Sequence, residues 1–244
     1  MAISPREDNS VATLALRSQI DKLTELPSDP LTAFRILRFD PWAFLRFAVY
    51  TKDQVDLLAP VKPAPTERSY IKTLVRIWEQ EPLFTLVKSR RMWCSWLFVS
   101  LYLWDTCMHR HRDNYFVSKK ESDADELVRR AEFIYESIPK KIWHPDLRPP
   151  KHYKENNLLF PGIGSGIHAV AQGADQLRQM TASGILMDEF GFWEKDKDTY
   201  TSSKPTIEGG GRVTIVSTPP PRYGTDPSFY QRLVEDTIDI QGEG

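Results

Sequence analysis

The sequence predicts an α/β protein with a mainly parallel central sheet flanked by helices. From residue 83 onward, apolar runs of strand length alternate with helical patterns, an order typical of parallel sheets. One of these runs, at residues 185–187, ends on two adjacent acids, Asp188 and Glu189. Burying charge is costly unless it is paired or metal-bound, and ligands of open α/β sheets bind beyond such strand tips. The pattern indicates either a functional site or a core strand that runs into a charged loop.

Length and composition set the broad class. The 244 residues are enough for one large or two small domains, and 41% hydrophobic residues exclude a wholly disordered chain. A net charge of −1 means that any polyanion must bind a local patch. Cys94 and Cys107 have neither disulfide-framework nor metal-ligand spacing, and no apolar stretch reaches about 18 residues. We expect an intracellular protein without membrane association.

Residues 1–66 are expected to form a helical N-terminal extension that ends in a stiff, Pro-rich connector. Two Asp-Pro pairs each predict a helix N-cap followed by proline at the first helical position. Thr51 and Gln54 have the spacing of a capping box, which predicts another helix start. The helices expected in this extension cover residues 11–26, 31–39 and 42–50, with a further one beginning at 51.

Residues 67–244 are expected to form the core. Ser118 and Glu121 have the spacing of a capping box, and the glycines of residues 162–166 indicate a turn because no long helix follows them. The expected strands cover residues 83–87, 115–117, 158–160, 167–170, 185–187 and 212–217. The expected helices cover residues 67–79, an apolar stretch to about Leu103, the stretch from Ser118 to about 138, and 228–237.

The strand, loop and helix at residues 83–103 form a candidate phosphate loop. Such a loop needs backbone N–H groups around the phosphates, a lysine charge, and a Ser or Thr hydroxyl on Mg²⁺. The usual string GxxxxGK[ST] is absent, because residues 89–95 are SRRMWCS. Lys88 nevertheless precedes the loop and Ser95 occupies the hydroxyl position. Without further context, a basic strand–helix turn on the surface is the simpler interpretation.

Two weaker signals accompany this loop. Ser217 and Thr218 place hydroxyls at a strand tip before Pro219, where they would sense a phosphate or simply end a strand. Arg178, ten residues before Asp188, is placed to act as an arginine finger or as a solvated surface arginine.

Four motifs together resemble a known family. KSRRM followed by a hydroxyl residue, FVSKKESDADELVRRAEFIYESIP, AQGADQLRQMTASGILMDEFGFW and VSTP occur in this order. From about residue 30 to the end, the chain resembles the ATPase domain of the large terminase subunit of tailed double-stranded DNA phages. The resemblance implies a P-loop NTPase fold of the additional-strand, catalytic-glutamate type. It also implies that Mg²⁺ and ATP are bound, and that hydrolysis drives viral DNA through a portal into a procapsid.

The resemblance also assigns roles to individual residues. It implies that Glu189 is the catalytic glutamate and that Arg178 is a finger offered to a neighbouring subunit, with Arg129 and Arg130 as weaker finger candidates. It implies that Ser95 and Asp188 hold Mg²⁺ and that Gln54 lies near adenine. The residues that it implies to bind nucleotide in the loop are Lys88, Ser89, Arg90, Arg91, Met92, Trp93, Cys94 and Ser95. The residues that it implies to couple hydrolysis to movement are Ser217, Thr218 and Pro219.

The resemblance further implies partners and a place of action. The expected partners are double-stranded DNA, the portal protein, the small terminase subunit and other copies of the chain in a ring on the procapsid. The expected location is the host cell cytoplasm. Large terminases carry a C-terminal nuclease domain, so we expect these residues to be a truncated ATPase fragment without nuclease activity.

The loop departs from the family pattern. Trp93 stands where the family usually has glycine, and Cys94 stands where many P-loops carry lysine. The loop is therefore wider here, or it opens and closes, or it binds nucleotide weakly without partners. Two other functions stay open: a different nucleic-acid translocase or helicase, and an interaction module with a degenerate P-loop.

Overall fold

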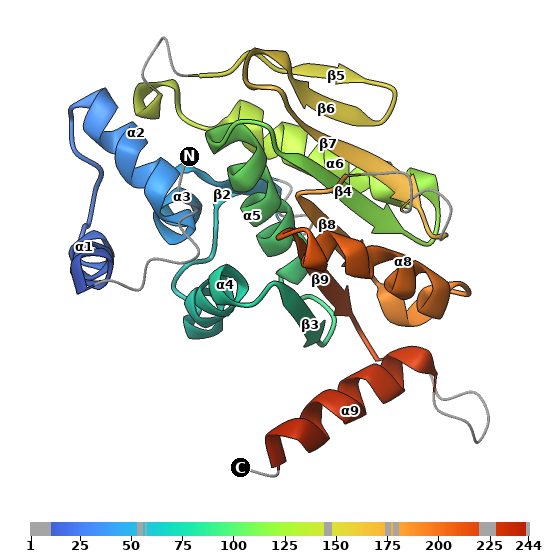
Figure 1. Cartoon of the computed structure of the whole chain (residues 1–244). Coiled ribbons are helices and arrows are strands. Elements are labelled where there is room, and N and C mark those ends of the chain that lie inside the picture. The colour runs from blue at the N-terminus through green and yellow to red at the C-terminus, as the bar shows by residue number, and fades with distance from the viewer. Residues whose placement is uncertain are drawn as a thin grey trace.

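The computed structural model describes residues 11–52, 56, 58–143, 148–173, 177, 181–219 and 228–242. Its centre is a seven-stranded sheet with the order β3-β9-β8-β4-β7-β6-β5 (Figure 1). The first five strands in that order run parallel, and β6 and β5 are antiparallel additions at one edge. The strands are β3 (Leu83–Val87), β4 (Asp113–Ser118), β5 (His152–Lys154), β6 (Asn157–Phe160), β7 (Ser165–Ala171), β8 (Gly184–Asp188) and β9 (Arg212–Ser217).

The position of β9 defines the topology. This strand comes last in the chain, yet it lies between β3 and β8 and pairs with both along its length. Val87 is level with Ser217, and Asp188 is level with Val216. The carboxyl ends of β3, β9 and β8 therefore meet at one edge, where parallel sheets bind their ligands. This arrangement confirms the additional-strand P-loop fold predicted from the sequence.

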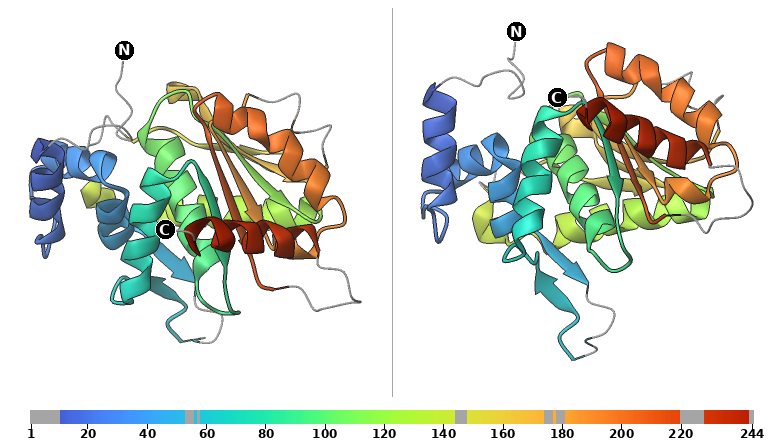
Figure 2. Two further views of the ribbon diagram at one scale, coloured as in Figure 1. Left: turned by 60° about the horizontal axis from the view of Figure 1, so that its bottom comes forward. Right: turned by 90° about the horizontal axis from the view of Figure 1, so that it is seen from below.

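Helices cover both faces of the sheet (Figures 1 and 2). Leu186 and Val216 point to one face and join a core with the buried residues of α5 and α6. Ile185, Met187 and Ile215 point to the other face and pack against residues of α8 and α9. This alternation follows from the two-residue period of a strand. The helices are α4 (Ser69–Gln80), α5 (Cys94–Met108), α6 (Glu121–Ser137), α8 (Asp196–Glu208) and α9 (Phe229–Gly242).

Helix α5 runs five residues beyond its expected end. The sequence turns polar at Asp105 and Thr106, but both side chains are buried and bonded to a neighbouring strand. The Asn114 amide donates to the Asp105 carboxylate at 3.1 Å and to the Thr106 hydroxyl at 2.8 Å. Paired polar groups can be buried at little cost, so the helix continues through them to Met108.

The N-terminal helices begin where the Asp-Pro pairs predict. The Asp29 carboxylate accepts from the Thr32 N–H at 2.8 Å, and Asp40 accepts from the Trp42 N–H at 2.7 Å. The helices of this part are α1 (Val11–Asp21), α2 (Pro30–Phe39) and α3 (Pro41–Ala48). Their buried residues belong to the same core as those of α5. The boundary at residues 66 and 67 stays a prediction.

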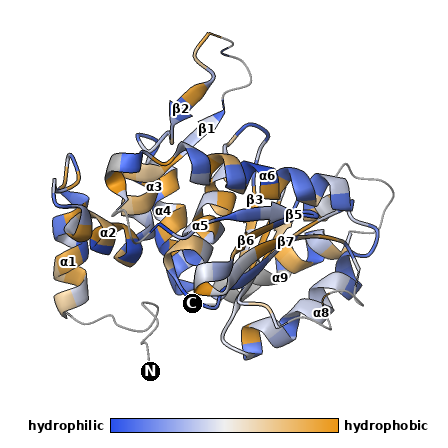
Figure 3. Cartoon of the chain, turned by 90° about the horizontal axis from the view of Figure 1, so that it is seen from above, coloured by the Kyte–Doolittle hydropathy of each residue, from blue (hydrophilic) through white to orange (hydrophobic). Residues whose placement is uncertain are grey.

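Both predicted capping boxes are wrong. Thr51 lies within β1 (Tyr50–Lys52), which pairs with β2 (Val61–Pro63) in a ribbon that projects from the body of the protein (Figures 2 and 3). Ser118 ends β4, and Lys120 is the N-cap residue of α6 without a side-chain cap. In both cases the hydroxyl residue belongs to a strand, and tertiary pairing decides its conformation.

Helix α8 and strand β5 were not expected from the sequence. Helix α8 has no apolar stripe, and the residues that it buries are Thr199, Ser202 and Ser203. The hydroxyls of Thr199 and Ser202 donate to backbone carbonyls four residues earlier, at 2.6 and 2.9 Å. Because this helix buries hydroxyls that satisfy themselves locally, hydrophobic periodicity does not reveal it.

Candidate nucleotide-binding site

The tips of β3, β8 and β9 bring together side chains that are distant in sequence. Lys88 follows β3, Asp188 ends β8, and Thr218 follows β9. Glu189 comes next to Asp188 with a φ of 52°, in the left-handed region that favours glycine. Such strain in a residue other than glycine is typical of functional sites.

Ser95 and Asp188 are in direct contact. The Ser95 hydroxyl, in the first turn of α5, lies 3.0 and 3.1 Å from the two carboxylate oxygens of Asp188. Burial and the charge of Glu189 raise the pKa of Asp188, while the Ser95 hydrogen bond and the charges of Lys88 and Arg130 oppose that rise. A hydroxyl and a carboxylate are hard oxygen donors of the kind that Mg²⁺ prefers.

These two donors fit a magnesium ion that is also held by a nucleotide. Among the described residues there is no group of three or more His, Cys, Asp or Glu side chains that could hold a metal. Mg²⁺ in nucleotide sites typically takes only one or two protein ligands and completes its shell with phosphate and water. The donor set is therefore suited to Mg²⁺ bound together with phosphates.

Glu189 is held between β3 and β9. Its Oε1 accepts from Lys88 Nζ at 2.7 Å, and its Oε2 accepts from the Thr218 backbone N–H at 3.2 Å and the Thr218 hydroxyl at 3.1 Å. Burial works to raise the pKa of Glu189, but the hydrogen bonds from Lys88 and Thr218 outweigh it and lower that pKa below its usual value. Glu189 is therefore an ionised hydrogen-bond acceptor.

The hydroxyl of Ser217 faces away from the pocket. It accepts from the Gly191 N–H at 3.0 Å and donates to the Thr218 carbonyl at 2.7 Å, and its residue is fully buried. Ser217 thus ties β9 to the segment after Glu189, whereas Thr218 lines the pocket. Pro219 is exposed at the end of this segment.

The candidate phosphate loop is held from outside. Tyr70 donates to the Met92 carbonyl at 2.9 Å, and the indole N–H of Trp93 donates to the Thr51 hydroxyl at 3.4 Å. Ser89 Oγ lies 3.3 Å from the sulfur of Met92. The Tyr70 contact connects the loop to α4 and the Thr51 contact connects it to the β1–β2 ribbon, whereas the Ser89–Met92 contact lies within the loop.

The departures from the usual P-loop string have a visible consequence. Trp93 has a φ of 60°, so the glycine-like backbone persists although the residue is bulky. Burial raises the pKa of the Cys94 thiol and keeps it neutral, and a thiol in any case carries no positive charge that could replace that of a lysine. Arg91 also has a positive φ, of 63°, and its side chain is exposed. Lys88, at the other end of the loop, supplies the charge instead.

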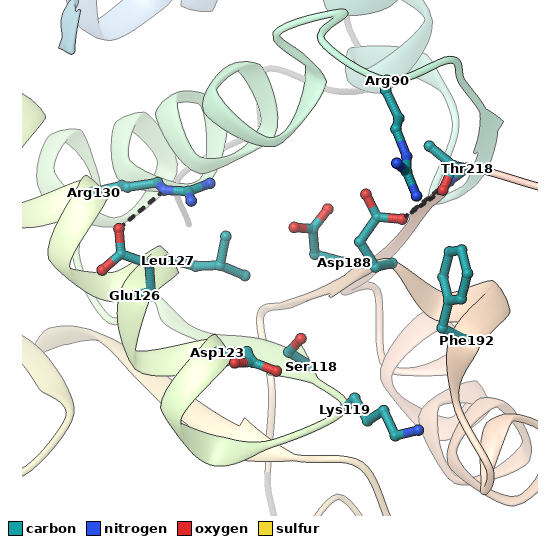
Figure 4. A pocket seen from close by; sticks show the side chains of 11 residues that line it. Arg90, Ser118, Lys119, Asp123, Glu126, Leu127, Arg130, Asp188, Phe192 and Thr218 are labelled. Carbon is teal, nitrogen blue, oxygen red and sulfur yellow. Dashed lines mark hydrogen bonds and ion pairs between the residues drawn. The ribbon is translucent and has the colours of Figure 1, made fainter. Parts of the chain in front are cut away.

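The strand tips border one pocket, with a volume of about 460 Å³. Figure 4 shows Arg90 and Arg130 pointing into it from different walls, with Asp188 between them. The residues that line it are Arg90, Ser118, Lys119, Asp123, Glu126, Leu127, Arg130, Asp188, Glu189, Phe192 and Thr218. The sequence did not indicate that Ser118, Asp123, Glu126, Leu127 and Phe192 face the site, because α6 and the segment after β8 reach it only through the fold.

Two of the predicted site residues, Gln54 and Arg178, lie outside the described residues. Of the two weaker finger candidates, Arg130 lines the pocket, whereas Arg129 pairs with Asp125 at 2.8 Å and is largely exposed. Within the described ranges, no helix is long and apolar enough to cross a membrane.

The strand order, with β9 between β3 and β8, and the site at their tips define a P-loop NTPase of the additional-strand, catalytic-glutamate type. Residues 85–235 match the family described as terminase large subunit, T4likevirus-type, N-terminal. The match spans more than half of the chain, and the chain belongs to this family of phage terminases. No curated protein matches the sequence.

One solved structure shows the same fold at low sequence identity. The large terminase of bacteriophage HK97 is 13% identical, with a TM-score of 0.59 over 84% of this chain and 42% of that chain. This chain thus spans less than half the length of the HK97 protein. The ATPase domain of the Thermus phage P74-26 large terminase is 13% identical, with a TM-score of 0.41 over 61% of each chain. A mutant of that domain is 12% identical, with a TM-score of 0.39 over 61% of this chain and 62% of that one.

Proposed function

We propose that this chain is the ATP-hydrolysing motor domain of a phage terminase. The observation that supports it most directly is the contact of Ser95 with Asp188 beside the Lys88–Glu189 ion pair. The strand tips and the first turn of α5 thus bring together two oxygen donors for a metal, a cation for phosphates and a carboxylate for water. Membership of the terminase family favours ATP as the substrate and double-stranded DNA as the cargo.

Each residue at the strand tips has a role in this proposal. Lys88 and Arg90 neutralise phosphate charge, and Ser95 and Asp188 hold Mg²⁺. When bound, Mg²⁺ neutralises the charge that develops as the phosphoryl group is transferred. Glu189 orients and polarises the attacking water, which requires the ionised form that its lowered pKa provides.

The hydrogen bonds of Glu189 connect nucleotide binding to residues 217–219, the segment proposed to couple hydrolysis to movement. Lys88 has three N–H donors and gives one of them to Glu189, and we expect the negative charge of an incoming nucleotide to draw Lys88 away from Glu189. Glu189 is then released toward water, while its second oxygen stays bonded to Thr218. Through Thr218, the loss of the Lys88–Glu189 bond would be felt in the neighbouring residues of the segment 217–219.

The remaining roles concern the assembled motor. We propose that Arg178 of one subunit completes the site of its neighbour in a ring, with Gln54 on the adenine side. Arginine fingers contribute about 10³–10⁵ in rate, so an isolated chain should hydrolyse ATP slowly. The proposed partners are the portal protein and the small terminase subunit, on a procapsid in the host cytoplasm. Residues 1–66 are proposed as an extension to the ATPase core.

The first test is nucleotide binding. Mg·ATP is titrated by calorimetry against the chain and against Lys88→Ala, with Lys154→Ala as a control because Lys154, on β5 at the edge of the sheet, pairs with Glu155. We expect binding by the chain and the control and a large loss in Lys88→Ala. Binding by none of the three would contradict the proposal and favour an interaction module. For an assembled ATPase, stimulation by procapsids supports packaging, and stimulation by free DNA alone supports another translocase.

A further inference from the structure

Arg130 lies where a second phosphate-binding cation would be useful. It belongs to α6 and lines the same pocket as Asp188, Glu189 and Thr218. Its side chain is 24% exposed and points into the pocket beside Asp188 (Figure 4). The pocket thus has one arginine from the phosphate loop, Arg90, and one from a helix on a different wall.

The position of Arg130 is fixed by an aromatic platform. Its guanidinium carbon lies 5.5 Å from the ring centroid of Trp96, which follows Ser95 directly in α5. The Trp96 ring packs edge-on against Phe133, with ring centroids 6.2 Å apart. Because Ser95 is the proposed metal ligand, this stacking places the guanidinium next to the end of the site where metal and phosphates would meet.

The ionic partner of Arg130 is a weak competitor for it. The Nε atom lies 3.5 Å from the carboxylate of Glu126, whose side chain is 59% exposed. An ion pair with an exposed partner at this distance contributes little, because water screens the charge of Glu126. A guanidinium has a planar fork of donors that fits phosphate oxygens, so a phosphate in the pocket would displace Glu126 easily.

The neighbouring arginine provides a contrast within the same helix. Arg129 donates through Nε to Asp125 at 2.8 Å, and its guanidinium carbon lies 5.3 Å from the ring centroid of Tyr153. Its side chain is 59% exposed and is not part of the pocket lining. Two adjacent arginines on one helix point to different surroundings, and only one of them faces the strand tips.

We propose that Arg130 is a catalytic residue that contacts the terminal phosphate of a nucleoside triphosphate bound to its own chain. This inference rests on the proposed function and specifies it further. Arg130 shares the pocket with Glu189, which is proposed to orient water at the γ-phosphate, so the contact is with that phosphate. A single chain then distinguishes ATP from ADP before any neighbouring subunit is present.

The test compares two nucleotides across four variants. Mg²⁺ complexes of ADP and of a slowly hydrolysed ATP analogue are titrated by calorimetry, with the protein dilute. The variants are Arg130→Gln, Arg130→Lys, Arg129→Gln as the matched control, and Lys88→Ala. For Arg130→Gln we expect about tenfold weaker binding of the triphosphate, about 1.4 kcal/mol for one charge-assisted hydrogen bond, and little change for ADP. Arg130→Lys should restore part of this loss, and Arg129→Gln should bind both nucleotides as the parent chain does.

Three results would overturn the inference. They are unchanged binding by Arg130→Gln, an equal loss for ADP and triphosphate, and an equal loss in Arg129→Gln. Thermal unfolding of each variant shows whether the Arg130 change only weakens packing on Trp96. Lys88→Ala separates this inference from the proposed function: if it loses binding while Arg130→Gln does not, only the inference fails. If the parent chain binds neither nucleotide, both fail.

Discussion

Replacing Glu189 by glutamine should strengthen nucleotide binding while it abolishes hydrolysis. Lys88 Nζ is bonded to Glu189 Oε1 at 2.7 Å, and we expect this bond to break when Lys88 turns to a phosphate. A hydrogen bond to a charged group contributes about 1.5–3 kcal/mol. The Glu189 side chain is 41% exposed, so screening reduces this to about 1 kcal/mol. Relief of that cost corresponds to roughly fivefold tighter binding of Mg·ATP.

The assay is a calorimetric titration of Mg·ATP against the parent chain and Glu189→Gln, with phosphate release measured on the same samples. Glu136→Gln is the control, because Glu136 has an ion pair with Lys151 at 2.8 Å and neither residue lines the pocket. We expect tighter binding without turnover for Glu189→Gln and no change for Glu136→Gln. Weaker binding by Glu189→Gln would refute the competition for Lys88, and sustained turnover would refute the role of Glu189.

Three further predictions follow from contacts described above. Trp93→Gly should have a higher free energy of unfolding in urea than Trp93→Ala, because both variants lose the indole but only glycine relieves a φ of 60° that costs about 1–3 kcal/mol. Asp40→Asn should lower the free energy of unfolding in urea by about 3 kcal/mol, because the fully buried Asp40 pairs with Arg76 at 3.0 Å. Asp29→Asn should change it little, because asparagine caps a helix equally well. The fold lowers the pKa of Glu189 from its usual value of 4.5. The ionised form of Glu189 therefore stabilises the fold above pH 4.5, and this stabilisation is lost as the pH falls through the lowered pKa of the folded state. Between about pH 6 and pH 3, urea unfolding of Glu189→Gln should therefore lose less stability than that of the parent chain.

The sequence was sufficient for the features that depend on local signals. The Asp-Pro caps set the starts of α2 and α3, and the alternation of strands and helices indicated a parallel sheet. The motif order placed Lys88, Ser95 and Asp188 at one site, and the structure brings these residues together. These features could be predicted because short apolar runs, caps and strand tips have the same physical meaning in most folds.

Other features depend on partners that the local sequence does not reveal. Asp105 and Thr106 of α5 indicated a helix end, because the local sequence does not reveal that Asn114 lies beside them and satisfies their polar groups. Helix α8 was missed because it buries hydroxyls, and Thr51 was misplaced because it pairs with β2. Arg129 and Arg130 were indistinguishable in sequence, since only the packing of α6 on α5 decides which one enters the pocket.

Strand β9 also has a mechanical consequence. It shares backbone hydrogen bonds with β3 on one side and β8 on the other, over the full length of both neighbours. Lys88 after β3 and the carboxylates at the end of β8 therefore cannot separate without breaking two ladders at once. The sheet therefore acts as a fixed base. If the proposed motor makes a power stroke, we expect it beyond the edge of the sheet, in the loop before α5 and in residues 218 and 219.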